Sequence, residues 1–246
     1  MQKTALITGG GTGLGQAITK QLAQKGVRVY IVGRRLQKLC ETQAFYPENI
    51  IPIRADVSTP AGRKIIAKKL KSIQLDYLVN NAGIVTPIVP LPDITLKNFR
   101  KTLATNVEGP LFLTQLLLPQ LNKNARVLLI SSDCAKLPLA HWVTYCTSKA
   151  ALSMIYGCLK KEFAGKDIHI GCIDPGMMDT PMQRYICQED IIFPEKYTWE
   201  ELKQENLLLS PDFSAAVCVK LLLELSPDAF SHKEFCAYDE PRVLPV

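Results

Sequence analysis

A tyrosine and a lysine in this chain have a spacing that supports acid–base chemistry. Tyr145 and Lys149 lie four positions apart in a segment with a helical pattern, so their side chains share one helix face. A phenol with its ordinary pKa of about 10 exchanges protons poorly at neutral pH, and a neighbouring ammonium stabilises the phenolate. Ser132 supplies a hydroxyl that can hold a carbonyl oxygen beside the phenol. A Tyr-x-x-x-Lys pair is common by chance, so this hypothesis needs support from the rest of the chain.

A glycine-rich turn near the N-terminus predicts a nucleotide site. The strand-like run Thr4–Thr8 leads into this turn, and the helical pattern Gln16–Gln24 follows it. Backbone N–H groups in such a turn approach a pyrophosphate closely, and a helix N-terminus favours its negative charge. Glycine also serves in ordinary turns, but its place between a strand and a helix favours the nucleotide. The expected contacts are Gly9, Gly11, Thr12, Gly13, Leu14 and Gly15.

The end of the second predicted strand indicates which nucleotide binds. Enzymes that use NAD typically carry an acidic residue there, which holds the ribose 2′-hydroxyl. This chain has Val32-Gly33 followed by Arg34 and Arg35. Guanidinium groups bind a 2′-phosphate, which a carboxylate would repel. NADP(H) is therefore favoured, although two solvated arginines at the start of a helix are an alternative interpretation.

Two further motifs follow predicted strands at the edge where open α/β sheets bind ligands. Asp56 and Val57 follow the third strand, and Asn81, Ala82 and Gly83 end the fourth. We expect all five to contact the nucleotide, although each motif in isolation could be a capped turn.

Strand-like and helical patterns alternate along the chain. The strands are predicted at Thr4–Thr8, Val27–Val32, Ile50–Arg54, Tyr77–Asn80, Arg126–Ser131, Ile168–Ile173 and Phe235–Tyr238, and the helices at about 14–25, 35–44, 60–73, 95–120, 143–164 and 211–224. This order predicts a single α/β domain over residues 1–246, a Rossmann-type doubly wound parallel sheet with helices on both faces. The irregular segment 180–208 is the expected cover over a substrate.

Composition argues against several other classes of protein. Hydrophobic residues make up 47% and charged residues 21% of the chain, as in ordinary globular enzymes. With no run of 18 apolar residues and no basic-then-apolar order at the N-terminus, we expect a cytoplasmic protein without membrane partners. The net charge is +6, but the densest basic run, Lys64–Lys71, fits an amphipathic helix, and no module that reads nucleic acid is present.

The cysteines form no ligand pattern. No Cys-x-x-Cys pair occurs and none groups with the three histidines, so we expect no metal site and reduced, mostly buried thiols. They are Cys40, Cys134, Cys146, Cys158, Cys172, Cys187, Cys218 and Cys236.

Taken together, the motifs resemble the short-chain dehydrogenase/reductase family over about residues 3–182. They are Thr8-Gly9-x-x-x-Gly13-x-Gly15, Asn80-Asn81-Ala82-Gly83, Asn106, Ser132, Tyr145-x-x-x-Lys149 and Pro175-Gly176. The resemblance implies that Tyr145 is the proton donor in reduction, that Ser132 orients the carbonyl, and that Lys149 binds the nicotinamide ribose and tunes Tyr145. It also implies a water-linked proton path at Asn106 and cofactor contacts from Tyr145, Lys149, Pro175, Gly176, Met178 and Thr180. Family members are usually homodimers or homotetramers.

The C-terminal part resembles the subgroup that contains sepiapterin reductase and benzil reductases. Two departures stand out. Cys236 occupies the place of an acidic residue that holds the pterin in pterin reducers, and Ala135 replaces a usual glycine after the serine. A pterin substrate is therefore disfavoured. His141 and Trp142 can line the pocket, although a surface position is favoured for His141.

The main hypothesis is an NADPH-dependent reductase of a ketone, diketone or aldehyde, with a hydrophobic or aromatic substrate suggested by the apolar 180–208 segment. Plain core packing is an equally good explanation of that apolar character. Two alternatives stay open. One is a non-catalytic NADP-binding sensor or scaffold, since a fold does not prove a function. The other is an NAD-dependent alcohol dehydrogenase.

Overall fold

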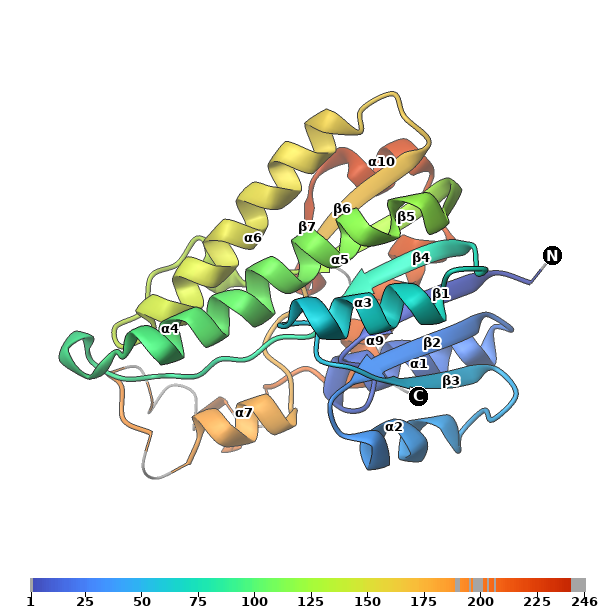
Figure 1. Cartoon of the computed structure of the whole chain (residues 1–246). Helices are drawn as coiled ribbons and strands as arrows, with labels where there is room; N and C mark the ends of the chain where they lie inside the picture. Colours follow the sequence, from blue (N-terminus) through green and yellow to red (C-terminus); the bar gives the residue numbers. More distant parts are fainter. Residues whose placement is uncertain are drawn as a thin grey trace.

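A parallel sheet forms the centre of the molecule (Figure 1). The computed structural model describes residues 2–188, 191–194, 196, 201–202, 204–205 and 207–239. Over these residues the strands are β1 (Thr4–Thr8), β2 (Arg28–Gly33), β3 (Ile50–Arg54), β4 (Leu75–Asn80), β5 (Leu121–Ile130), β6 (Ile168–Asp174) and β7 (Glu234–Cys236). Their spatial order is β3-β2-β1-β4-β5-β6-β7, and all neighbours pair in parallel. The order reverses between β1 and β4, which is where open sheets of this kind leave a ligand crevice.

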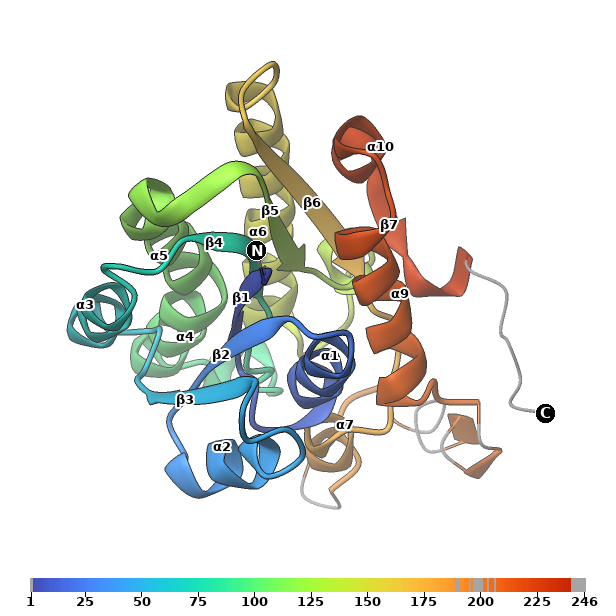
Figure 2. The same ribbon diagram turned by 90° about the vertical axis from the view of Figure 1, so that its right-hand side faces the viewer.

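Helices cover both faces of the sheet, as Figure 2 shows. One face carries α1 (Gly13–Gln24), α2 (Leu36–Gln43), α9 (Pro211–Leu223) and α10 (Pro227–His232). The other carries α3 (Pro60–Lys69), α4 (Leu96–Leu103), α5 (Gly109–Leu117) and α6 (Val143–Glu162). Each face has its own apolar core, so the central strands are buried on both sides; every residue of β4 is buried. This burial explains why the strands are nearly continuous apolar runs.

The predicted fold class is confirmed, and most element bounds agree within two residues. The helix predicted from about 211 does begin at Pro211, because the Ser210 side chain accepts a hydrogen bond from the Phe213 N–H and proline suits the first turn. Thr59 caps α3 in the same way, accepting from the Gly62 N–H.

Four predicted boundaries were wrong. The helix expected over 95–120 is interrupted by a π-helical segment at Ala104–Glu108 and ends in a 3₁₀ turn, Leu118–Gln120. The strand expected at Arg126 begins earlier, at Leu121, because Leu121 pairs with Leu75 of β4 before a register shift. The helix expected over 60–73 ends at Lys69. The final strand is Glu234–Cys236, and the chain then turns into a 3₁₀ segment, Ala237–Asp239.

The segment 180–208 is more regular at its start than the sequence predicted. It begins with a short helix, α7 (Pro181–Ile186), which is capped by Thr180 and lies below the carboxyl edge of the sheet in Figure 1. A bridge between Met178 and Leu209 ties the two ends of this segment together. Residues 189, 190, 195, 197–200, 203 and 206 of the predicted cover lie outside the described residues.

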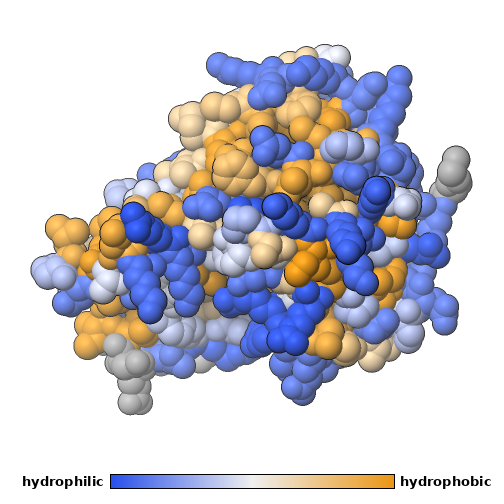
Figure 3. Space-filling view, in the orientation of Figure 1, coloured by the Kyte–Doolittle hydropathy of each residue, from blue (hydrophilic) through white to orange (hydrophobic). Residues whose placement is uncertain are grey.

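The surface at one end of the molecule is hydrophobic. Figure 3 shows apolar side chains over the loop before α4 and the start of α4, where Leu91 and Leu96 are 73% and 61% exposed. This loop and α7 lie toward the same end of the molecule (Figure 1). Among the described helices, none is long and apolar enough to cross a membrane.

Candidate active site

The glycine turn is held in place by the ends of the neighbouring strands β2 and β4. The Gly9 N–H donates to the Val32 carbonyl at 2.8 Å, and Gly9 has a φ of +71°, which glycine tolerates best. The Asn81 side-chain amide donates to the Thr8 carbonyl at 2.8 Å. In return, the Thr8 hydroxyl accepts from the backbone N–H groups of Asn81 and Ala82, both at 2.9 Å. The glycine turn and the Asn81-Ala82-Gly83 segment, which the sequence predicted as separate motifs, are therefore joined by hydrogen bonds.

The start of α1 is suited to an anion. Its N-cap residue, Thr12, makes no side-chain cap, and the first turn contains no acidic residue. The first N–H groups of a helix lack partners within the helix, so a phosphate can accept from them. Gly9, Gly11, Thr12, Gly13 and Leu14 all line the adjoining cavity. The residues present thus fit the pyrophosphate of a dinucleotide.

Gly15 does not line this cavity and has a packing role instead. A Cβ atom added to Gly15 would lie 2.4 Å from the Gly9 carbonyl oxygen and 2.5 Å from the Asn81 side-chain nitrogen. Real Cβ atoms do not approach so closely, so Gly15 lets α1 lie against the turn and Asn81. A direct contact of Gly15 with the nucleotide stays a prediction.

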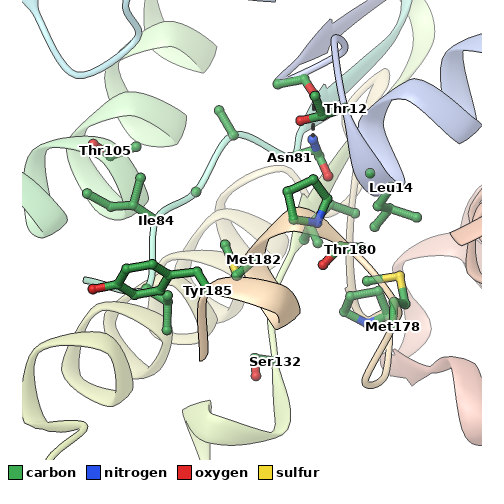
Figure 4. Close-up of a pocket in the computed structure, with 18 of the residues that line it drawn as sticks. Thr12, Leu14, Asn81, Ile84, Thr105, Ser132, Met178, Thr180, Met182 and Tyr185 are labelled. Carbon is green, nitrogen blue, oxygen red and sulfur yellow. Dashed lines mark hydrogen bonds between the residues drawn. The ribbon is translucent and has the colours of Figure 1, made fainter. Parts of the chain in front are cut away.

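A cavity of about 680 Å³ joins the glycine turn to the predicted catalytic residues. It lies at the carboxyl edge of the sheet, where Figure 4 shows residues from separate segments facing the same space: Thr12 and Leu14, Asn81 and Ile84, Ser132, and Met178 to Tyr185. The predicted site residues that line it are Gly9, Gly11, Thr12, Gly13, Leu14, Arg34, Arg35, Asp56, Val57, Asn81, Ala82, Gly83, Ser132, Tyr145, Lys149, Pro175, Gly176, Met178 and Thr180.

One corner of the cavity is basic. Arg34 and Arg35 line it as expected, and Lys38 joins them from the first turn of α2. Lys38 also pairs with Glu41 at 2.6 Å. The sequence reasoning missed Lys38, although its position three residues after Arg35 at the start of a predicted helix was an available signal.

Tyr145 and Ser132 lie close together at the buried end of the cavity. Tyr145 is 8% exposed, and its ring packs edge-on against Trp142 with centroids 5.8 Å apart. The Ser132 hydroxyl donates to Asp133 Oδ1 at 2.9 Å and accepts from the Cys134 N–H at 3.2 Å. Burial raises the pKa of Tyr145 well above its usual range, and a hydrogen bond with Ser132 opposes that shift. Burial therefore favours the protonated form of this phenol.

Lys149 reaches the same region from the next turn of α6. Its Nζ donates to the Ile130 carbonyl at 2.8 Å and lies 5.6 Å from the centre of the Tyr145 ring. Burial lowers the pKa of Lys149 to about 8. The bond to Ile130 anchors the ammonium at the end of β5, beside the Tyr145 ring.

Asn106 lies in the π-helical segment and does not line the cavity. Its side-chain amide donates to the Ile84 carbonyl at 2.8 Å and to the Ser148 hydroxyl at 2.9 Å, and its oxygen accepts from the Ile84 N–H at 2.9 Å. These hydrogen bonds hold the loop after β4 against α6. The part of Asn106 in a water-linked proton path stays a prediction, and π-helical segments such as this one are frequent at functional sites.

Part of the cavity lining is apolar. It consists of Ile84, Val85, Trp142, Met182 and Ile186, and the sequence predicted only Trp142 among them by name. Met182 and Ile186 come from α7, so the start of the predicted covering segment does border the cavity. His141 does not line it; its Nδ1 lies 2.9 Å from the Ile192 carbonyl oxygen, in agreement with the surface position favoured for it. Cys236 and Ala135 are also outside the lining.

The cysteines are less buried than expected. All eight are free thiols, but only Cys134, Cys172 and Cys218 are buried, while Cys40 and Cys158 are exposed. The apolar pattern around Cys40 and Cys158 placed them in helices without indicating that they face outward. Within the described residues, no group of three or more His, Cys, Asp or Glu side chains is arranged to hold a metal ion.

The fold and the site together define a class of protein: a dinucleotide-binding oxidoreductase with a Ser-Tyr-Lys group at the carboxyl edge of a parallel sheet. The family model described as short chain dehydrogenase matches residues 3–190. The chain belongs to the short-chain dehydrogenase family.

Several relatives are similar over most of their length. A benzil reductase ((S)-benzoin forming) of Bacillus cereus is 31% identical over 250 residues, which cover 96% of this chain and 98% of the relative. An L-xylulose reductase of Caenorhabditis elegans is 33% identical over 189 residues, 74% of each chain. Among solved structures, a short-chain dehydrogenase/reductase of Saccharomyces cerevisiae superposes with a TM-score of 0.88 at 27% identity and covers 97% of both chains.

Proposed function

We propose that the protein is an NADPH-dependent reductase of hydrophobic or aromatic ketones, diketones or aldehydes. The observation that carries this proposal is the meeting of Ser132, Tyr145 and Lys149 in one cavity that continues to the glycine turn. The absence of an acidic side chain after β2, together with Arg34, Arg35 and Lys38 in the lining, supports NADPH over NADH.

The geometry supports a separate role for each of the three residues. When bound, the reduced nicotinamide supplies the hydride that adds to the carbonyl carbon. The Ser132 hydroxyl turns from Asp133 to donate to the carbonyl oxygen, which orients the substrate. Tyr145, which burial keeps protonated, then gives its proton to that oxygen as the alcohol forms. Lys149 supplies a positive charge beside the resulting phenolate, because its Nζ is already near the Tyr145 ring.

The apolar wall supports the substrate class. Ile84, Val85, Trp142, Met182 and Ile186 offer few hydrogen bonds, so they favour a substrate with aromatic or aliphatic groups beside the carbonyl. The similarity to a benzil reductase over nearly the whole chain points in the same direction. A homodimer or homotetramer and a cytoplasmic location remain predictions from the sequence.

The test is oxidation of NADPH by the purified chain in the presence of benzil, other aromatic diketones, quinones, aldehydes and pterins. We expect reduction of at least the aromatic diketones and a loss of roughly 100- to 10,000-fold in kcat for Tyr145→Phe, the range that a positioned acid contributes. Tyr156→Phe is the matched control, since Tyr156 lies on the same helix but donates to the Ser231 carbonyl. Equal activity of Tyr145→Phe and the parent would contradict the assignment.

A further inference from the structure

Two cysteines lie next to the proposed catalytic residues, both along the chain and in space. Cys134 follows Ser132 by two positions, and Cys146 directly follows Tyr145. Their thiols are within hydrogen-bonding reach of each other, and both belong to the apolar cluster around Trp142. Cys134 and Cys146 are also the two cysteines that adjoin Ser132 and Tyr145 along the chain, so this pair is the candidate for joint chemistry.

The two thiols differ in their surroundings. Cys134 is 4% exposed and lines the cavity, whereas Cys146 is only partly buried and lies 3.9 Å from the Leu137 carbonyl oxygen. The hydrogen bond between the pair lowers the pKa of Cys146 and raises that of Cys134. An accessible thiol that ionises readily beside a second, protonated thiol is the usual arrangement of an oxidant-sensitive pair.

We propose that Cys134 and Cys146 form a reversible disulfide on exposure to a peroxide, and that this bond switches off carbonyl reduction. The Cys146 thiolate attacks one oxygen of hydrogen peroxide, giving a sulfenic acid and hydroxide. The Cys134 thiol then attacks the sulfenic sulfur, and the hydroxyl group leaves as water. In total, two thiols and one peroxide give one disulfide and two waters, and a dithiol reductant reverses the change.

The bond would disturb the active site because Cys134 is tied to Ser132. The Cys134 N–H donates to the Ser132 hydroxyl at 3.2 Å and to Asp133 Oδ1 at 2.7 Å. A disulfide brings its two sulfurs to about 2.05 Å, which is closer than two hydrogen-bonded thiols lie. A shift of the 3₁₀ turn Asp133–Ala135 displaces Ser132, and a shift of the first turn of α6 displaces Tyr145, so closing the bond disturbs the proposed catalytic pair in either case.

Tryptic digestion can locate the bond directly. Cleavage after Arg126, Lys136 and Lys149 places Cys134 in the peptide 127–136 and Cys146 in the peptide 137–149, each with a single cysteine. We expect peroxide-treated, alkylated full-length protein to yield these two peptides joined as one mass. We also expect the reduction rate to fall by roughly 100-fold, the cost of misplacing a catalytic group by an ångström, and to return with dithiothreitol.

Cysteine variants distinguish the proposed disulfide from general oxidation damage. For each variant, the rate of carbonyl reduction after peroxide is compared with the rate of the same untreated protein. Cys146→Ser should retain its rate under peroxide, and Cys134→Ser should carry a sulfenic acid on Cys146 without a cross-link. Cys158→Ser, which removes an exposed cysteine of the same helix, should respond like the parent.

The inactivation part of this inference rests on the proposed function, whereas the cross-link is read by mass alone. If the protein reduces no carbonyl even before peroxide treatment, the proposed function is wrong. The mass of the joined peptides still decides whether Cys134 and Cys146 form the disulfide. If the joined peptides are absent after peroxide treatment, the proposed disulfide is wrong. If they are present but the rate of carbonyl reduction is unchanged, the proposed inactivation by the disulfide is wrong.

Discussion

At the scale of single residues, burial is the main influence on the acid–base groups. Tyr145 and Lys149 are both buried, and burial disfavours the charged form of each, so it raises the pKa of the phenol and lowers that of the ammonium. The sequence predicted that the two groups share a helix face, and this is correct. It could not predict that Lys149 donates to Ile130, because that carbonyl belongs to a strand far away in the chain.

This burial predicts the pH dependence of reduction. The pKa of Lys149 is lowered to about 8, so its positive charge is present below that pH and is lost as the pH rises through it. Tyr145 remains protonated over the same range because its pKa is raised. We therefore expect kcat/KM for carbonyl reduction to fall above about pH 8, measured at saturating NADPH.

Lys149→Arg provides the control for this profile, since a guanidinium stays charged at alkaline pH. The variant should be slower than the parent at neutral pH but should lack the fall near pH 8. A parent enzyme whose rate stays level well above pH 8 would show that Lys149 does not control this step.

At the scale of elements, the site depends on strand–turn–helix units whose turns must fit closely. The unit β1–turn–α1 presents its N–H groups to the cavity because Gly15 lets α1 pack against Gly9 and Asn81. Gly157 is also a helical glycine, in α6, but a Cβ there would meet nothing within 4 Å. Both glycines lie within helices, and they differ in what a Cβ atom would meet there.

Replacing each of these glycines by alanine should have opposite effects on stability. We expect Gly157→Ala to raise the free energy of unfolding by about 0.5–1 kcal/mol, because glycine costs backbone entropy inside a helix. Gly15→Ala should lower it by about 1–3 kcal/mol through overpacking and should also weaken nucleotide binding. Urea unfolding measures the free energy of unfolding, and cofactor titration measures nucleotide binding. A Gly15→Ala protein that is stabilised and binds the nucleotide normally would refute the packing role of Gly15.

At the scale of the whole molecule, the sheet order gathers the site. Residues from the ends of β1, β2, β3, β4, β5 and β6 meet at one edge because the strands are parallel and their order reverses beside β1. The cavity therefore spans from the basic corner at Arg34 to Tyr145. A ligand that fills this span and binds only the folded chain must stabilise the whole molecule.

The thermal stability should report which dinucleotide fits. At about 100 times its Kd, a ligand adds about 2.7 kcal/mol, which for a chain of this size raises Tm by roughly 5–10 °C. We expect NADPH to give a larger shift than NADH at equal concentration, and Arg34→Asp to reverse the order. Arg28→Asp, at the opposite end of β2, should keep the parent's order. Equal shifts with both dinucleotides in the parent would contradict a basic 2′-phosphate site.

The sequence by itself determined the alternating elements, the parallel sheet and most of the residues around the cavity, because strand runs, glycine turns and helix caps are local features. The sequence also predicted that these residues lie together, because ligands bind at the carboxyl edge of such sheets. Only the tertiary structure decided that Gly15 packs, that the Asn106 side chain braces Ile84 and Ser148, and that Lys38 and the α7 residues line the cavity. These outcomes depend on distances between segments remote in the chain, and no local pattern encodes such distances.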